Sequence, residues 1–289
     1  MKEKFTFRNG YAGRTLFKIF NFILFAVIVI AIVIPIYKVL VDSFDLTTVY
    51  GLSLWPRKFS TSAYRMIFTT TGLYQPFLIS VYVTVLGTLI GLLLCTLGAY
   101  VLIQHEMPGR KFFSYFLLFT MIFNGGLVPT YLVIRDFNML NTLWAVILPI
   151  SMSVYNLILM RNFFEDIPKS LYESAELDGC TPMGTFWRIV LPLSKAALAS
   201  IGLFFAVGFW GEYTSFTLYI NKAELFNFQV KLRSLILNDE SLAVAASEGI
   251  PAKAIQNAAI IVAILPFAII YPFCQKYFVT GVTMGSVKE

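Results

Sequence analysis

Side chains able to do covalent or metal chemistry are few and scattered in this 289-residue chain. His105 is the only histidine and stands beside a Pro-Gly turn, where a histidine normally meets solvent, so a Ser/His/Asp triad is disfavoured. The cysteines Cys95, Cys180 and Cys274 lack the paired spacing of a disulfide framework or a metal site. We therefore expect no catalytic residues and no bound metal.

One carboxylate stands within a long apolar stretch. Glu212 follows Trp210 and precedes Tyr213. Aromatic rings stack on sugar faces and carboxylates accept sugar hydroxyls, so these residues are candidates to line a pathway. An interfacial or intersubunit hydrogen bond of Glu212 explains the pattern equally well. Asn124, followed by Gly125-Gly126, either breaks a helix at the same pathway or marks a place where small residues permit close helix packing.

The stretch from Glu165 to Lys195 predicts two short helices joined by a glycine turn. Asp166 is expected to cap a helix that Pro168 opens, and Gly179 to end it in a left-handed turn. Thr181-Pro182 repeats the start signal, and Leu191-Pro192 is expected to end the second helix. The residues expected along one face of each helix are Leu171, Ala175 and Asp178 in the first, and Met183, Phe186, Ile189 and Val190 in the second.

This stretch looks built to dock into another protein. An alternative is a pair of amphipathic helices lying on the inner leaflet of a membrane. The first helix carries Glu173, Glu176 and Asp178 against a single Lys169. Anionic lipids would repel that face, so protein docking is favoured.

The elements that position these residues are membrane helices. The chain is 58% hydrophobic and 13% charged with a mean hydropathy of +0.75, so it lacks the charge to cover a water-facing surface. Long apolar runs predict an all-α polytopic membrane protein with six transmembrane helices. They lie between Lys18 and Lys38, and over Pro76–Gln104, Phe112–Ile134, Asn141–Met160, Ala196–Ile220 and Asn257–Phe278.

Charge distribution predicts the orientation of these helices. Lys and Arg are more numerous on the side of the N-terminal segment, which holds Lys2, Lys4, Arg8, Arg14 and Lys18. Both termini should therefore be cytoplasmic. The net charge of +6 is then explained by topology, and no nucleic-acid partner is expected.

Two long extracytoplasmic stretches follow from this orientation. Residues 42–75 carry Trp55, Pro56, Tyr64 and Tyr74, a mix typical of a segment at the lipid headgroups. Residues 221–256 carry charges of both signs and a Gly249-Ile250-Pro251 turn, which favours contact with an external partner.

The chain resembles the permease subunits of bacterial ABC importers. Glu173-Ser174-Ala175, Gly179, Ile189 and Leu191-Pro192 match the spacing of the EAA loop of that family. The stretch 123–131 and the tail from Gln275 to Lys288 are similar to the carbohydrate-uptake, MalG-like branch, and most of all to permeases of complex oligosaccharide and uronate importers. The resemblance covers Pro76 to Glu289 well. Ser174 replaces the usual second alanine and Ala196 a frequent proline, and neither change removes the docking role.

The resemblance implies a type I importer permease fold. It implies a single permease domain over 1–289 with a five-helix core at 76–278 and a cytoplasmic EAA loop at 166–192. Its implied partners are a second homologous permease, two cytoplasmic ATPase subunits, an extracytoplasmic solute-binding protein and membrane lipid. ATP and Mg would be bound by the ATPases alone, because this chain has no G-x-x-x-x-G-K-[ST] phosphate loop. The ATPase-coupling residues would be Glu173, Ser174, Ala175, Asp178, Gly179, Ile189, Leu191 and Pro192.

By the same resemblance, Glu173 would contact a basic residue of an ATPase cleft, and the Leu191-Pro192 break would pass motion to the fifth and fourth spans. Residues 221–256 would reach toward the binding protein, and Val279–Glu289 would lie near the ATPases. Two other functions stay open: an ion-gradient-driven secondary transporter, and an ABC importer permease for a non-sugar solute. A secondary transporter predicts several intramembrane acids or a symmetric repeat of broken helices, and neither is visible.

Overall fold

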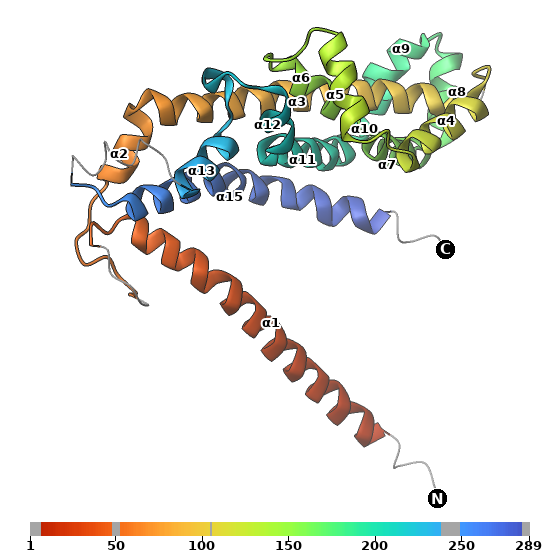
Figure 1. The fold of residues 1–289 in the computed structure, drawn as a ribbon. Helices are drawn as coiled ribbons and strands as arrows, with labels where there is room; N and C mark the ends of the chain where they lie inside the picture. Colours follow the sequence, from red (N-terminus) through yellow and green to blue (C-terminus); the bar gives the residue numbers. More distant parts are fainter. Residues whose placement is uncertain (1–6, 48–52, 105, 238–248, 285–289) are drawn as a thin grey trace, which may run out of the picture. The chain divides into compact units, whose positions relative to one another are not determined.

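The computed structural model describes residues 7–47, 53–104, 106–237 and 249–284. These residues form helices joined by turns, with one isolated antiparallel bridge between Asp45 and Phe59 (Figure 1). The chain divides into two compact units. Unit 1 comprises Met1–Ile67 and Asp239–Val262, and unit 2 comprises Phe68–Asn238 and Ala263–Glu289.

Six apolar spans are present in the described residues when each bent helix pair counts as one span, which confirms the predicted number. Three are long helices: α1 (Phe7–Ser43), α3 (Thr71–Ile103) and α15 (Ala252–Met284). The other three are bent pairs. They are α4 (Arg110–Ile122) with α5 (Leu127–Asp136), bent by 113°; α6 (Trp144–Ser151) with α7 (Val154–Glu165), bent by 42°; and Pro182–Leu193 with α11 (Lys195–Gly211), bent by 82°.

Three of the predicted spans were wrong in their continuity. One of them, Asn141–Met160, is interrupted at Met152–Ser153 between α6 and α7. The stretch Phe112–Ile134 is broken between α4 and α5, where Gly126 has a φ of 88° that a helix cannot contain. The predicted span Ala196–Ile220 ends as α11 at Gly211, because Glu212 has an extended backbone with a ψ of 119°. A separate short helix, α12 (Thr214–Tyr219), follows.

Helix α3 lies at the centre of unit 2 and packs along α11, α7 and α6 (Figure 1). Close packing depends on glycines of α3: a Cβ on Gly91 would lie 2.9 Å from the ring of Phe205, and one on Gly98 would lie 2.8 Å from Leu157. Phe205 and Leu157 are themselves buried. The missing side chains therefore allow bulky neighbours to approach the backbone of α3, as small residues do in membrane helix pairs.

In unit 1, an aspartate organises the turn that follows α1. Asp45 accepts backbone hydrogen bonds from Thr47, Arg57 and Lys58 at 2.8–3.2 Å, and another from the Thr47 hydroxyl. Burial disfavours the charged carboxylate, but these hydrogen bonds outweigh burial and lower the pKa of Asp45 to about 2. Asp45 thus joins Thr47 to residues 57–58.

Tyr64, on the short helix α2 (Ser62–Thr69), is half-buried in unit 1. Its hydroxyl lies 2.6 Å from Ser43 Oγ, and its ring packs 4.8 Å from the ring of Phe44. Trp55 is instead 78% exposed. The prediction that both aromatic residues lie at the headgroups therefore stays a prediction for Trp55, whereas Tyr64 packs inside the unit.

Candidate functional site

The EAA loop folds as two short helices about a left-handed turn, as predicted. Helix α8 (Lys169–Leu177) ends at Gly179, which has a φ of 74°. The Cys180 N–H donates to Ala175 O at 2.9 Å and the Gly179 N–H donates to Glu176 O at 3.0 Å, which is the Schellman pattern. Thr181 caps α9 (Pro182–Thr185) by accepting a hydrogen bond from the Gly184 N–H at 3.2 Å.

Two boundary predictions for this loop were wrong. Asp166 does not cap α8: it ends α7 in a helical conformation, and Pro168 precedes α8 with no side-chain cap. Leu191-Pro192 does not stop the second helix either. The chain passes from α9 through a π-helical turn, η1 (Phe186–Val190), into α10 (Leu191–Leu193), and breaks only at Ser194.

The π-helical turn has a local cause. Pro192 has no N–H to donate, and the Leu191 N–H bonds the carbonyl of Phe186 five residues back. The widened turn allows the helix to continue past the proline. The bend of 82° therefore falls at Ser194, two residues after the predicted stop.

One side of the EAA loop packs against other residues of unit 2 and the other side is exposed. Ala175, Phe186 and Val190 are buried, and Ile189 and Leu191 are half-buried. Of the coupling candidates, Glu173, Ser174, Asp178, Gly179 and Pro192 are exposed. Leu171 and Met183, predicted on the faces of the two helices, are also exposed. Each predicted face is thus buried in part and exposed in part.

The exposed side includes apolar residues that the sequence analysis missed. Leu177 is 90% exposed and Trp187 is 55% exposed. Leu177 follows Glu173 by one helical turn, so the two share a face of α8. The four-residue spacing of Glu173 and Leu177 could have revealed this mixed surface from the sequence. A carboxylate beside exposed apolar side chains is a surface suited to a protein partner.

The base of the EAA loop is attached to α3 and α7. The Tyr100 hydroxyl of α3 donates to Pro182 O at 2.8 Å. The Tyr172 hydroxyl of α8 donates to Phe164 O at 3.3 Å, and burial, with a smaller contribution from Tyr100, raises the pKa of Tyr172 to about 12. Tyr172 therefore stays a donor at physiological pH. Just before the loop, Glu165 accepts from Arg161 at 2.9 Å and from Arg110 at 3.2 Å.

The candidate pathway residues at the C-terminal end of α11 and just after it make contacts inside unit 2. Glu212 Oε1 accepts a 2.6 Å hydrogen bond from the Ser215 N–H in the first turn of α12. Trp210 is buried, and its Nε1–H donates to Ala263 O at 3.0 Å. Tyr213 is half-buried, and the guanidinium carbon of Arg233 lies 4.7 Å from its ring centroid. Trp210 therefore serves interior packing, whereas Tyr213 keeps part of its surface open.

Asn124 lies in the break between α4 and α5 and is exposed. Its Oδ1 accepts a 2.9 Å hydrogen bond from the Gly126 N–H. This confirms that Asn124 and the two glycines lie at a helix break, and their place on a pathway stays a prediction. The side chain stabilises the break and is also accessible at it.

A second polar residue, Asn227, was missed. It is fully buried, donates from Nδ2 to Glu212 O, and caps α13 (Phe228–Leu237) by accepting from the Val230 N–H at 3.0 Å. An asparagine before a helix is a common N-cap and was the available signal, but the bond to Glu212 joins residues 15 positions apart. Asn227 fixes the start of α13 to the end of α11.

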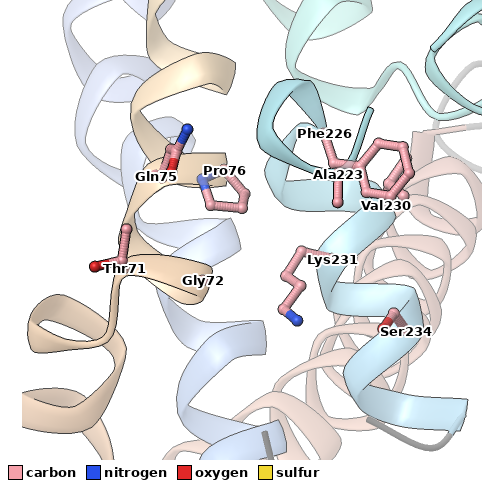
Figure 2. A pocket seen from close by; sticks show the side chains of 9 residues that line it. All are labelled: Thr71, Gly72, Gln75, Pro76, Ala223, Phe226, Val230, Lys231 and Ser234. Atoms are coloured by element: carbon pink, nitrogen blue, oxygen red, sulfur yellow. The ribbon is translucent and has the colours of Figure 1, made fainter. Parts of the chain in front are cut away.

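A pocket of about 220 Å³ lies between the first turn of α3 and the segment formed by the 3-10 turn η2 (Ala223–Leu225) and α13. Figure 2 shows Pro76 of α3 and Phe226 on its two sides, with Lys231 extending from α13. Gln75 Nε2 donates to Glu224 O at 3.0 Å beside it. The pocket is therefore bordered by contacts that join α3 to residues 223–237.

Some predicted features lie outside the described residues: His105, residues 48–52 and 238–248 of the two long loops, and the tail 285–289. Within the described part of the chain, no group of three or more His, Cys, Asp or Glu side chains could hold a metal ion.

Comparison with known proteins gives a family match. Residues 66–284 match the family described as "Binding-protein-dependent transport system inner membrane component". The polygalacturonan/rhamnogalacturonan transport system permease protein YtcP of Bacillus subtilis (strain 168) is 42% identical over 240 residues, which cover 81% of this chain and 84% of that protein. Protein LplC of the same organism is 36% identical over 299 residues and the full length of both chains.

A solved structure is similar throughout. It is the crystal structure of a bacterial ABC transporter involved in the import of the acidic polysaccharide alginate. One of its chains superposes with a TM-score of 0.86 at 29% sequence identity, covering 92% of this chain and 98% of the other. The predicted type I importer permease fold is thereby confirmed.

Proposed function

The chain belongs to the family of binding-protein-dependent transport system inner membrane components, and from that premise we propose that it moves an oligosaccharide or sugar derivative as a permease subunit of an ATP-driven ABC importer. Members of this family are transport subunits and not enzymes, and ATP hydrolysis belongs to separate subunits. The chain is a multi-pass protein of the bacterial cytoplasmic membrane. ATP and Mg are assigned to the partner ATPases.

An acidic oligosaccharide is the cargo class that we favour. The name of one relative specifies polygalacturonan and rhamnogalacturonan, and the similar solved structure concerns alginate import. These polymers share uronate units, so their fragments are polar, hydroxyl-rich and negatively charged. Asn124 and the partly open Tyr213 can contact such hydroxyls, and Glu212 holds the start of α12 beside Tyr213. Trp210 supports this region from the interior.

Coupling to the ATPases is assigned to the exposed side of α8. The observation that carries this assignment is the pairing of Glu173 with Leu177, which is 90% exposed, on the short helix α8. A hydrogen bond of Tyr172 attaches α8 to α7, and the next helix of the loop, α9, is attached to α3. Ser174, Ala175, Asp178 and Gly179 shape the helix and its turn. Ile189, Leu191 and Pro192 form the connection to the bend at Ser194.

The assembly that we propose contains this chain, a second homologous permease, two cytoplasmic ATPases, an extracytoplasmic solute-binding protein and surrounding lipid. Both termini and the EAA loop (166–192) face the cytoplasm, and residues 221–256 face the binding protein. The permease core extends over 76–278 within a single functional domain of 1–289. Within unit 1, none of the most apolar part of α1 is buried, which suits contact with lipid or the second permease.

Co-purification from mild detergent tests the coupling assignment. The transporter is co-expressed with tagged chain, either wild type, Glu173→Arg or Leu177→Asn. We expect wild type to retain the second permease and the ATPase. Each variant should keep the permease but bind the ATPase about tenfold more weakly, since a buried interface contact contributes 1–2 kcal/mol. The matched control is Glu106→Arg, an exposed charge reversal outside α8.

Three results would each contradict part of the proposal. ATPase retention by both variants would show that α8 is not the contact. Sugar uptake that survives deletion of the ATPase but collapses with an uncoupler would instead support an ion-gradient-driven carrier. Uptake of a non-sugar solute alone would leave the coupling assignment intact and reject the cargo class.

A further inference from the structure

Helix α3 makes polar contacts near both of its ends. Ser80 and Tyr100 are separated by about 20 residues, or ~30 Å along an α-helix, which is the thickness of the hydrocarbon core. Tyr100 contacts the EAA loop, and Ser80 contacts α13. One helix therefore holds elements that the proposed orientation puts on opposite sides of the membrane.

The cytoplasmic contact combines a hydrogen bond with ring packing. The Tyr100 hydroxyl donates to Pro182 O at 2.8 Å. Its ring lies 5.0 Å from the ring of Phe186, which is fully buried in η1. Both segments of the second EAA helix, α9 and η1, are thus fixed to the same residue of α3.

The contact at the other end has the same form. Ser80 Oγ accepts a 2.8 Å hydrogen bond from the Phe228 N–H at the start of α13, and both residues are buried. The rings of Phe77 and Phe228 pack edge to face at 5.7 Å. Gln75 adds its hydrogen bond to Glu224 O beside the pocket (Figure 2). Movement of α3 along its axis would therefore displace α13.

Helix α3 is better suited to carry motion than α11. The chain bends by 82° at Ser194 between the EAA loop and α11, so part of any displacement there can be absorbed as rotation. Helix α3 has no break between Ser80 and Tyr100, and its Pro76 lies before this stretch. Its glycines pack against buried Phe205 and Leu157, which holds its sides in place.

We propose that α3 is a rigid link that transmits movement of the EAA loop to α13, with Tyr100 and Ser80 as the positioning residues at its two ends. This inference rests on the proposed function, in which the EAA loop binds the ATPase and α13 belongs to the segment facing the binding protein. Arrival of the loaded binding protein at α13 would then stimulate ATP hydrolysis through the same helix in the reverse direction.

The experiment uses the complete transporter in nanodiscs and measures ATPase activity with and without loaded binding protein. Tyr100→Phe removes one hydroxyl and keeps the ring packing on Phe186. Ser80→Ala removes the acceptor of the Phe228 N–H. Each variant should lower the stimulation by the binding protein about fivefold, the effect of one hydrogen bond, and leave basal ATPase activity unchanged. The double variant should resemble the single variants, because both interrupt one link.

The matched control is Thr84→Val, one helical turn from Ser80. The Thr84 hydroxyl is buried and has no hydrogen-bond partner within the described residues, so its loss should leave stimulation unchanged. The proposal is overturned if Tyr100→Phe or Ser80→Ala behaves like this control, if basal activity falls in parallel, or if the effects multiply in the double variant. If one of these results is obtained while Glu173→Arg still weakens ATPase binding, the role of α3 as a rigid link is rejected and the proposed function is retained.

Discussion

Glycines in two spans of this chain have opposite structural consequences. In α3, Gly87, Gly91 and Gly98 stand within an unbroken helix of 33 residues. Between α4 and α5, Gly125 and Gly126 stand in a break with a bend of 113°. The spans are both apolar, so residue type and hydropathy alone do not decide whether a glycine packs or breaks a membrane helix.

The neighbours of each glycine explain the difference. Along α3, buried rings and a leucine occupy the space where side chains would stand, and packing stabilises the helical backbone. At Gly126 no heavy atom lies within 4 Å of a Cβ position, α4 has no buried residue, and the Asn124 side chain bonds the Gly126 N–H. A helix without tertiary support thus yields to a local hydrogen bond.

The largest expected effect is that of Gly87→Ala in α3. The new Cβ would overlap the ring of Phe209, which is buried and cannot swing into open space. Overpacking should lower stability by about 2–3 kcal/mol. Thermal unfolding of the purified transporter measures this effect as a lower apparent Tm.

Two variants sharpen that test. Gly72→Ala lies on the same helix where no atom is within 4 Å of the added Cβ, and should not destabilise. Phe209→Leu combined with Gly87→Ala should recover part of the loss by freeing space. If Gly72→Ala and Gly87→Ala lower the apparent Tm equally, close packing is not the reason for glycine in α3.

A smaller effect is expected for Gly126→Ala in the α4–α5 break. Its φ of 88° and ψ of 175° belong to a region that is open almost only to glycine, so alanine should cost about 1–3 kcal/mol through backbone strain, with no steric overlap. Sugar uptake by proteoliposomes and apparent Tm should both fall.

Gly125→Ala is the matched control for that variant. Its φ is not positive, and the nearest atom to an added Cβ, in Pro129, lies at an ordinary 3.9 Å. Equal losses for the two alanine variants would contradict the explanation by backbone strain.

These contrasts show which features the sequence could predict. Gly179, Thr181 and the Asn124 break were predictable, because a left-handed turn or a cap depends on residues next to each other in the chain. The hydrogen bond from Trp210 to Ala263 joins residues 53 positions apart, and the one from the Phe228 N–H to Ser80 joins residues 148 apart. Such partners depend on the tertiary fold, so the sequence did not reveal the burial of Trp210 and missed Asn227.

The smallest effect on stability is expected at Asn124. Variants of this residue also distinguish a role in stabilising the fold from a role in transport. Asn124→Ala removes the acceptor of the Gly126 N–H, and because the site is exposed the stability cost should be about 0.5–1 kcal/mol. Asn124→Asp keeps an acceptor oxygen at the same place and should retain the apparent Tm. If Asn124 lines the pathway of an acidic sugar, the added negative charge should nevertheless lower uptake, and more strongly at low salt, where charge repulsion is less screened. If uptake instead follows the apparent Tm in both variants, Asn124 only stabilises the break. The difference between the glycines of α3 and those of the α4–α5 break would then concern the folded structure and not transport.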